Sequence, residues 1–279
     1  MTEPVAATRL AARQVAKPWG RAVLPPPFSH PGIERIGEIW FEAETGPALP
    51  IMAKYLFTSE KLSIQVHPDD AEARARGMPS GKEECWLVLD AEPGGCLGIG
   101  TLHPLSAEEL REAALSGEIE QLIEWKPVQR GDFYYIPAGT VHAIGAGVSL
   151  IEIQQNADIT YRLYDYGRPR EMHLDEGVAV ARAVPYPPAL HRRIDIEVDQ
   201  MLVDGPHFSL RLTGERDARL NGTGPLLIIP IAGSVTANVQ GEPMSVGVGG
   251  CLSVTGDLPH IPSAGARLLL ARAKGGWPE

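Results

Sequence analysis

The sequence predicts a mainly β protein that folds as two related β-barrels with short helical insertions, the second barrel being degenerate. Its 279 residues include 30 Gly and 25 Pro, so turn-forming residues interrupt the chain often. The apolar runs between these residues are short and rich in β-branched and aromatic side chains, which favours strands over a helical bundle. The runs form two groups of unequal length, and we therefore expect two barrels.

Strand-like segments recur between residues 36 and 165. They read IGEIWFEA, IMAKYLF, KLSIQVH, ECWLVLD, DFYYIPA, VSLIEIQQ and ITYRLYD. Helices are predicted over residues 69–76, where carboxylates open the segment, and over residues 171–183. Ser106 and Glu109 form a capping-box pattern before a third helix, which gives a helical insertion near residues 104–125.

A Pro-rich passage, VPYPPALHRR, separates the first group of strands from the second. We therefore expect one domain over residues 1–183 and another over residues 184–279. The second domain again reads as strands, in FSLRL, PLLIIPIAGSVTANV, SVGVGGCLSV and ARLLLARA. It is poor in polar residues that could bind a ligand.

The composition excludes several classes of function. Lys and Arg number 25 against 35 Asp and Glu, and a net charge of -10 repels nucleic acid. No apolar run reaches the length of a membrane span, so we expect a cytoplasmic protein without a membrane partner, as a monomer or small homo-oligomer. The 3 Cys lack a CxxC spacing, which disfavours a disulfide scaffold or a thiolate metal site. An anionic small substrate would need a local cluster of cations.

Three short motifs carry candidate metal ligands. In LSIQVHPDD, strand alternation places Gln65 and His67 on the same face. Glu84, in GKEECWLVLD, shares a side with Trp86, and an inward carboxylate needs a cation or hydrogen bonds. His142 ends a G-x5-P-x-G-x-x-H pattern in which turn residues place it at the mouth of a strand. Each motif alone also has an ordinary interpretation: a surface strand, an exposed strand-end charge or a structural histidine.

A fourth motif, LIEIQQNADITYRLYDYGR, follows the candidate ligand His142. It brings together Glu152, Asp158, Arg162 and Arg168 within a short stretch. Arginine offers planar, bidentate recognition of phosphate. The alternative interpretation is a solvated charged strand, but an acid and two guanidinium groups beside a candidate metal ligand favour a binding site.

In sequence order, the strand ending in His67, the Glu84 segment and the P-x-G-x-x-H turn resemble the two signature motifs of the cupin β-barrel. Gln65 stands where that family usually has the first His of an H-x-H pair. A set of Gln65, His67, Glu84 and His142 suits one divalent ion, for which we expect Zn²⁺. A single carboxylate leaves the ion with a net positive charge, which favours Lewis-acid chemistry.

The motifs together resemble those of type I phosphomannose isomerases, in particular the short bacterial form. The matching segments are KPWG, IGEIW, LPIMAKYL, LSIQVHPDD, GKEECW, GDFYYIPAGTVHAIG, IEIQQNADITYRLYDYGR and PREMHL. The resemblance is dense from residue 17 to about residue 183. It implies that the first domain is the catalytic, metal-binding cupin, with ligands at Gln65, His67, Glu84 and His142.

The resemblance also implies roles for the charged residues. The active-site lysines of that family fall on Lys54 and Lys82, its acid falls on Glu152, and its active-site arginine falls on Arg162. Asp158 matches the aspartate of an S-D-x-x-x-R stretch, although Ala157 replaces the serine. Arg168 stands where longer relatives carry a lysine. Lys54, Arg162, Arg168 and Asp158 are the expected substrate-binding residues.

The reaction that the resemblance implies is the interconversion of mannose 6-phosphate and fructose 6-phosphate through an enediolate. A base must move one carbon-bound proton. Glu152 is the first candidate for that base, with Lys82 or a metal-bound water as alternatives. The expected catalytic residues are therefore Glu152, Lys82 and Arg162, and the expected partner is a small sugar phosphate.

Two other functions fit the sequence less well. A non-catalytic sugar-phosphate-binding cupin would have lost Lys82, Glu152 or Arg162, and all three are present. A cupin dioxygenase would favour redox-active iron, and the amide ligand Gln65 and the cationic residues disfavour it. In the second domain, GGCLSVTGDLPHI resembles a decayed cupin motif. His260 has the ligand spacing there, but Thr255 replaces the turn proline, so we expect no metal in that barrel.

Overall fold

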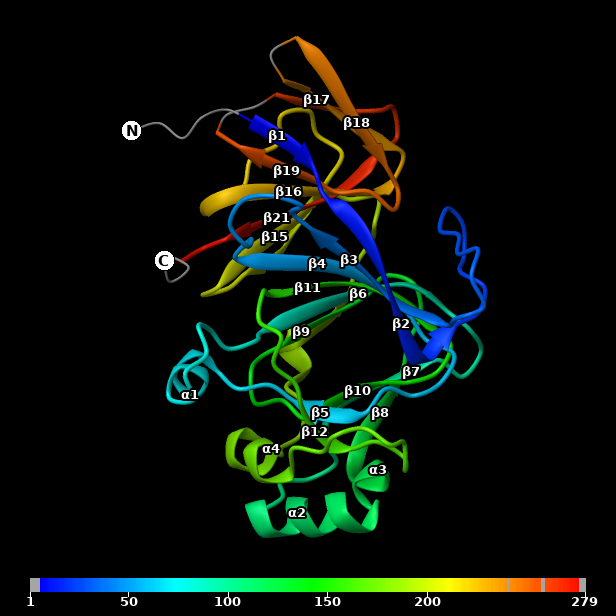
Figure 1. Cartoon of the computed structure of the whole chain (residues 1–279), viewed down its shortest axis with the longest axis vertical. Coiled ribbons are helices and arrows are strands. Elements are labelled where there is room, and N and C mark those ends of the chain that lie inside the picture. Colours follow the sequence, from blue (N-terminus) through cyan, green and yellow to red (C-terminus); the bar gives the residue numbers. More distant parts are fainter. Residues whose placement is uncertain (1–5, 240, 257–258, 276–279) are drawn as a thin grey trace.

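The structure, a computed structural model, describes residues 6–239, 241–256 and 259–275. It confirms the mainly β fold, in which the strands form two barrel-like units stacked along the long axis (Figure 1). Short helices gather at the end of the first unit.

Two facing sheets make the first barrel (Figure 1). The seven-stranded sheet has the order β13 (His191–Arg193), β9 (Asp132–Ile136), β6 (Glu84–Ala91), β11 (Val148–Gln155), β4 (Ile51–Phe57), β3 (Ile36–Glu42), β2 (Ala11–Arg21). The five-stranded sheet has the order β12 (Tyr161–Tyr164), β5 (Ile64–Val66), β10 (His142–Ile144), β7 (Cys96–Thr101), β8 (Ile123–Pro127). All the pairings between named strands of both sheets are antiparallel.

The second barrel is built in the same way from a larger and a smaller sheet. The larger has the order β1 (Ala6–Arg9), β19 (Leu252–Thr255), β16 (Thr223–Ala232), β21 (Arg267–Ala273), β15 (Phe208–Thr213), β14 (Gln200–Asp204). The smaller has the order β18 (Glu242–Gly247), β17 (Ser234–Val239), β20 (His260–Pro262). Strand β1 pairs with β19, and β13 pairs with β9 of the first barrel, so each half of the chain lends a strand to the other unit. The division at residue 183 stays a prediction.

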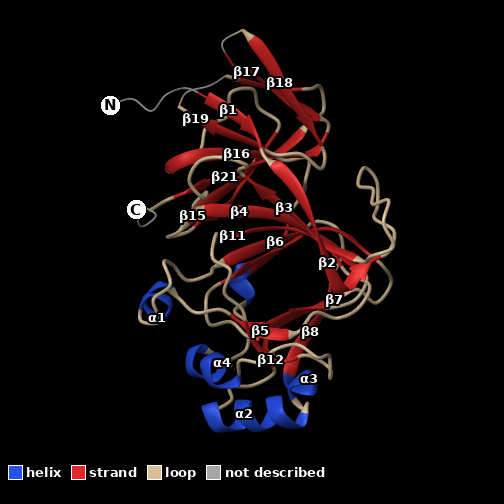
Figure 2. Ribbon diagram, in the orientation of Figure 1, coloured by secondary structure: helices blue, strands red, loops and turns tan. Residues whose placement is uncertain are grey.

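The helices are short and mostly cover one sheet. They are α1 (Asp70–Arg74), α2 (Ala107–Ser116), α3 (Ile119–Leu122), α4 (Leu174–Val180) and a 3-10 turn at Pro188–Leu190. Ser106 and Glu109 form the predicted capping box of α2, which ends at Gly117 with a φ of 84°. Helices α2, α3 and α4 lie against the outer side of the five-stranded sheet (Figure 2). An apolar cluster that includes Leu110, Ile64 and Tyr161 joins the helices to that sheet.

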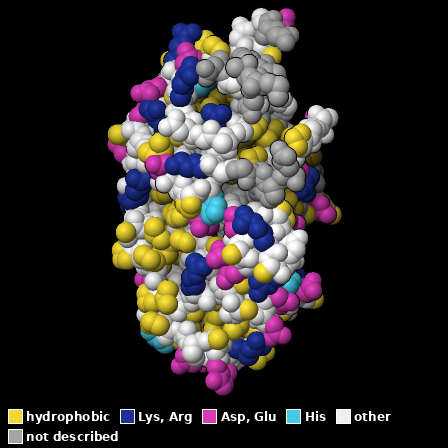
Figure 3. Space-filling view, turned by 90° about the vertical axis from the view of Figure 1, so that its left-hand side faces the viewer, with side chains coloured by type: hydrophobic (Ala, Val, Ile, Leu, Met, Phe, Trp, Pro, Cys, Tyr) yellow, Lys and Arg dark blue, Asp and Glu magenta, His cyan; other side chains and the backbone are white. Residues whose placement is uncertain are grey.

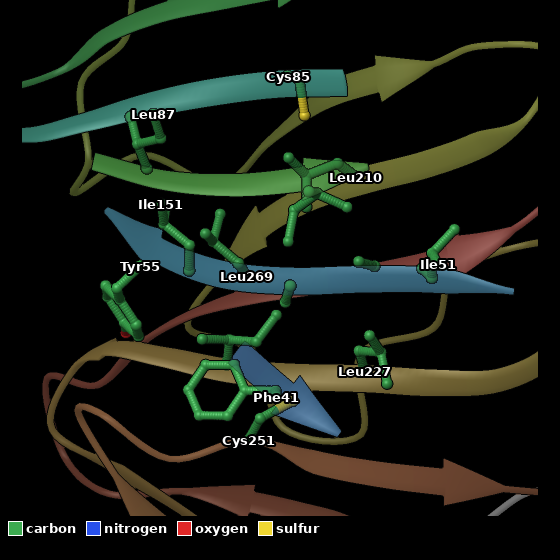
Figure 4. Close-up of a cluster of buried hydrophobic side chains, with 14 of the residues drawn as sticks. Phe41, Ile51, Tyr55, Cys85, Leu87, Ile151, Leu210, Leu227, Cys251 and Leu269 are labelled. Atoms are coloured by element: carbon green, nitrogen blue, oxygen red, sulfur yellow. The ribbon is translucent and has the colours of Figure 1, made fainter. Parts of the chain in front are cut away.

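Strand alternation gives the seven-stranded sheet two different faces. One face packs on the second barrel, through an apolar layer in which Tyr55, Ile151 and Leu87 meet Leu269 and Leu227 (Figure 4). The intervening residues of the same strands point into the first barrel, because successive side chains of a strand point to opposite faces. The apolar layer thereby fixes which side chains line the barrel interior.

In the described part of the chain, no helix has both the length and the apolar character needed to cross a bilayer. Figure 3 shows one face of the molecule, where Lys and Arg are interspersed with Asp and Glu. Among the described residues visible on that face, the basic side chains do not form a continuous patch.

Candidate active site

The candidate site lies between the inner faces of the two sheets of the first barrel. On the seven-stranded sheet, Lys54 of β4 is the cross-strand partner of both Trp40 of β3 and Glu152 of β11. Glu152 is in turn opposite Trp86 of β6. Antiparallel register therefore aligns four side chains from four strands in one row, since directly opposed residues project to the same face.

A second row crosses the five-stranded sheet. Gln65 of β5 is the cross-strand partner of both Arg162 of β12 and His142 of β10. The prediction that Ile64 and Val66 lie on the opposite face from Gln65 is confirmed, because both pack in the apolar cluster under the helices. Gln65 therefore projects in the opposite direction, into the barrel.

His67, Glu84 and His142 form a compact group at the centre of the site. Their ligand atoms lie within 4.8 Å of one another, and each residue is about 1% exposed. The Glu84 carboxylate lies between the rings, with Oε2 3.5 Å from His67 Nε2 and Oε1 3.4 Å from His142 Nε2. Among the described residues, neither carboxylate oxygen has a hydrogen bond of good geometry, although the Lys82 ammonium lies 2.8 Å from Oε2. A buried carboxylate of this kind is stabilised by a cation.

Hydrogen bonds fix the orientation of both imidazole rings. His67 Nδ1 donates to the Ile159 carbonyl over 2.7 Å, and His142 Nδ1 donates to the Thr140 carbonyl over 2.8 Å. Each Nε2 is then the atom with the free lone pair. Burial lowers the pKa of His67 well below its usual value and lowers that of His142 to about 4, so both rings are neutral at pH 7. Neutral imidazoles and a carboxylate are a donor set that suits a divalent ion such as zinc.

The Gln65 side chain lies beside this group. Its Nε2 lies 3.2 Å from His142 Nε2, while its Oε1 accepts a hydrogen bond from Ser63 Oγ over 3.2 Å. A half-turn of the amide exchanges the two atoms and turns the oxygen towards the group. The structure thus brings all four predicted ligands together, and the ligand role of Gln65 stays a prediction.

Two lysines and an acid lie beside this group. Lys54 Nζ is 2.9 Å from Glu152 Oε1, and Lys82 Nζ is 3.8 Å from the same oxygen. Lys82 Nζ also lies 2.8 Å from Glu84 Oε2 and 3.1 Å from His67 Nε2. Lys82 therefore links the His–Glu–His group to Glu152, and all of these side chains are buried.

Burial and neighbouring charges set the proton affinities in this part of the site. Burial, with the nearby Glu84 carboxylate, raises the pKa of Glu152 above its usual value, against the opposing effect of Lys54 and Lys82. Burial disfavours the charged form of Lys54, but Glu152 and Glu38 more than compensate and raise its pKa. Glu152 is therefore a carboxyl group with raised proton affinity, which is the property expected of an acid–base residue at neutral pH.

The site opens into a cavity of about 250 Å³, a volume that accommodates a small polar ligand. Predicted residues Lys54, Lys82, Asp158 and Arg162 line it. Arg162 is half-buried, and its guanidinium makes no ion pair with any described residue. A smaller cavity of about 60 Å³ adjoins the first and is lined by Gln65, Glu84 and Glu152.

One predicted residue lies elsewhere. Arg168 lines neither cavity, and its guanidinium binds the Asp165 carboxylate over 3.0 Å and the Lys61 carbonyl. The chain turns just before this residue, at Tyr166 and Gly167, which both have positive φ. Its predicted role in substrate binding therefore finds no support in its position.

The cavity also has lining residues that the sequence analysis did not name as site residues. They include Lys17, Glu38, Trp40, Met52, Gln154, Asn156, Thr160 and His173 around the larger cavity, and Arg170 at the smaller one. Strand alternation could have identified Gln154, two residues after Glu152 on β11, and Glu38, two residues before Trp40 on β3. Lys17 and His173 lie in the matching segments KPWG and PREMHL, but only tertiary packing brings those segments to the cavity.

A His–Glu–His group inside a jelly-roll barrel defines a cupin whose barrel interior can hold a metal ion. Comparison of the sequence with known proteins identifies the family within this class. Mannose-6-phosphate isomerase ManA of Bacillus subtilis is 33% identical over 226 residues, which cover 74% of this chain and 71% of that protein. Mannose-6-phosphate isomerase of Streptococcus mutans is 33% identical over 206 residues, which cover 68% of this chain and 64% of that protein. This chain belongs to the mannose-6-phosphate isomerase family.

The solved structures agree with the sequence comparison. The crystal structure of mannose 6-phosphate isomerase from Bacillus subtilis superposes with a TM-score of 0.74 at 26% identity, covering 96% of this chain and 99% of that one. A putative mannosephosphate isomerase from Archaeoglobus fulgidus has the same fold, with a TM-score of 0.72 at 16% identity and coverage of 98% and 99%. No family model matches the sequence.

Proposed function

We propose that this protein interconverts mannose 6-phosphate and fructose 6-phosphate by moving a proton between adjacent sugar carbons. The observation that carries the proposal is the closeness of three features around two adjoining cavities. They are the His67–Glu84–His142 group, the buried Lys54–Glu152–Lys82 chain and the guanidinium of Arg162, which has no ion-pair partner among the described residues. Aldose–ketose isomerisation needs stabilisation of an oxyanion, a proton carrier and an anchor for phosphate.

The donor set supports a metal cofactor, which we propose is Zn²⁺ held by His67, Glu84, His142 and the Gln65 amide. A dication there supplies Lewis-acid stabilisation of the oxygens on the reacting carbons. The fit rests on two observations: the buried Glu84 carboxylate without well-formed hydrogen bonds, and the two neutral rings oriented by backbone carbonyls. A solved neighbour described as bound with zinc and yttrium shares this fold, with a TM-score of 0.67 at 15% identity.

Glu152 is our proposed acid–base residue. Its raised pKa matches a group that must both accept and return a proton. Trp86 Nε1 donates to Glu152 Oε2 over 3.0 Å, and Lys54 binds the other oxygen, so the carboxylate has a fixed orientation. Lys82 lies between Glu152 and Glu84, where its ammonium can stabilise negative charge as it develops on the substrate.

Arg162 is the proposed phosphate anchor, with Asp158 and Lys54 nearer the sugar hydroxyls. The three residues line the same cavity. Lys54 and Lys82 are matched to buried carboxylates, whereas Arg162 has no acidic partner at ion-pair distance among the described residues. This local excess of positive charge lets a protein of net charge -10 bind an anionic sugar.

A coupled assay with mannose 6-phosphate, run before and after chelation and after zinc is restored, tests the proposal. We expect turnover that chelation abolishes and zinc restores, and a Glu84→Ala variant that loses both zinc and activity. Binding of the sugar phosphate without turnover would support the non-catalytic alternative. Full turnover of metal-free protein would contradict the metal role, and turnover of a different sugar phosphate alone would contradict the substrate.

A further inference from the structure

The segment from Gly81 to Glu84 carries two residues of the site, Lys82 and Glu84, which are two positions apart. Its backbone is held at three successive amides. Gly81 N donates to Asp70 Oδ1 over 2.9 Å, Lys82 N donates to the Pro68 carbonyl over 3.0 Å, and Glu83 N donates to Gln155 Oε1 over 2.9 Å. Two of the three acceptors are side chains, so the position of this segment depends on them.

Asp70 and Gln155 are themselves joined. Gln155 Nε2 donates to Asp70 Oδ1 over 2.9 Å, and this is the oxygen that accepts from Gly81 N. The Gln155 backbone N also donates to the Glu83 carbonyl over 3.0 Å. Gln155 is only 6% exposed. Its amide therefore uses both ends of its side chain to connect α1 with the segment before β6, largely shielded from water.

Gly81 shows how closely these two segments pack. A Cβ at residue 81 would lie 2.4 Å from the Asp69 carbonyl carbon and 2.6 Å from Asp70 N, so no larger residue fits without backbone movement. Asp69 and Asp70 follow directly after His67 and Pro68 in the chain. The network therefore sets the distance between the segment that carries His67 and the segment that carries Lys82 and Glu84.

We infer that Asp70 and Gln155 are positioning residues, which hold Lys82 and Glu84 in place relative to His67 and Glu152. Neither side chain lines the cavities. The role rests on the proposed function, because it assigns a purpose to the geometry of Lys82. Displacement of a reacting group by about 1 Å can cost about 100-fold in rate. Residues that orient metal ligands contribute about 10- to 100-fold in metal affinity or activity.

The second barrel reaches this network through one side chain. His207, in the turn between β14 and β15, lies 3.9 Å from Asp70 Oδ2 and 3.6 Å from Glu83 Oε1. Tyr135 of β9 donates to the other Glu83 oxygen. The network thus lies where the two barrels meet, and the side chains of Asp70 and His207 stay 25% exposed there.

The test compares Asp70→Ala and Gln155→Ala with Asp69→Ala. Asp69 is a matched control: its side chain caps α1 by accepting from Glu72 N and pairs with Arg182, but it forms no hydrogen bond or ion pair with residues 81–84, all of which the structure describes. We expect Asp70→Ala and Gln155→Ala to lower kcat and zinc affinity by about 10- to 100-fold with KM within about threefold of wild type. Asp69→Ala should lower the Tm without changing zinc affinity. Asp70→Asn keeps an acceptor oxygen for Gly81 N and should recover most of the loss.

Zinc affinity is measured by competition with a chromophoric chelator on protein stripped of metal, and kcat and KM by the coupled assay. If Asp70→Ala does not fold, Gln155→Ala and Asp70→Asn still test the positioning role. The inference is wrong if Gln155→Ala has the same zinc affinity and the same kcat as Asp69→Ala. Absence of isomerase activity in the wild type would overturn the proposed function instead, and the zinc measurements would still test the positioning role.

Discussion

Arg162 and Arg168 are six residues apart, and both were predicted to bind the substrate, yet their surroundings differ. Arg162 lines both cavities, while the Arg168 guanidinium is occupied by Asp165 and by the Lys61 carbonyl. The desolvation of Arg162, together with neighbouring Arg170, lowers its pKa from the ordinary value, although it stays charged at neutral pH. A desolvated cation without an acidic partner is best satisfied by an anionic ligand.

We expect Arg162→Ala to raise the KM for mannose 6-phosphate and to lower kcat/KM by about 10- to 100-fold. Charge-assisted hydrogen bonds contribute about 1.5–3 kcal/mol, which corresponds to that factor. Steady-state kinetics measure it. Arg168→Ala is the informative comparison, because its position predicts a change in KM of less than about threefold. An equal rise of KM in both variants would restore Arg168 to the substrate site.

At the level of secondary-structure elements, a buried carboxylate adds side-chain bonds to the backbone pairing of β13 with β9. Asp132 is 1% exposed and accepts hydrogen bonds from the Gln129 amide and from Arg193 of β13. His191 Nε2 lies 3.1 Å from Asp132 Oδ1. Burial opposes ionisation of Asp132, but these hydrogen bonds outweigh it and hold its pKa below the usual 3.8. The charged form is therefore the one that holds the edge strand in place.

This shift gives a pH prediction whose sign follows from linkage. The folded state binds the Asp132 proton more weakly than the unfolded state does, so the resulting stability is present above pH 3.8 and declines as the pH falls below that value. We expect Asp132→Asn to lower the Tm at pH 7, and the difference from wild type to shrink as the pH falls below about 4. Thermal denaturation across pH 3–7 measures it. Asp90→Asn, at an exposed position on β6, is the control, and a difference that grows on acidification would contradict the assignment.

At the scale of the whole molecule, one apolar layer joins the two barrels. It contains residues of β3, β4, β6 and β11 on one side and of β15, β16 and β21 on the other (Figure 4). Burial of a large aliphatic side chain contributes about 1.5–3 kcal/mol, so a layer of this extent stabilises both sheets together. The same layer orients the candidate site, because it fixes the outward face of the seven-stranded sheet.

We expect Leu269→Ala to lower the free energy of unfolding by about 2–5 kcal/mol, since the fully buried side chain leaves a cavity between the sheets. Denaturant-induced unfolding followed by fluorescence measures the change. Met201→Ala, on β14 and 43% exposed, should change it by less than about 0.5 kcal/mol. A loss below about 1 kcal/mol for Leu269→Ala would show that the layer contributes little.

The sequence alone predicts the mainly β fold, the capping box of α2 and the directions in which Gln65 and Glu84 project. These features follow from local chemistry: the two-residue period of a strand, the hydrogen bonds of a helix end and the breaking of strands by Gly and Pro. The candidate site could be assembled from motifs because most of its members lie on strands, where spacing alone sets direction.

The pairing of the strands and the partner of each charged side chain come from the tertiary structure. Contacts between distant segments determine the exchange of β1 and β13 between the barrels, the different surroundings of Arg162 and Arg168, and the addition of Lys17 and His173 to the cavity. The bond between Asp70 and Gln155 spans 85 residues of chain. Local sequence specifies the direction of a side chain, but the partners that set its charge and position come from packing.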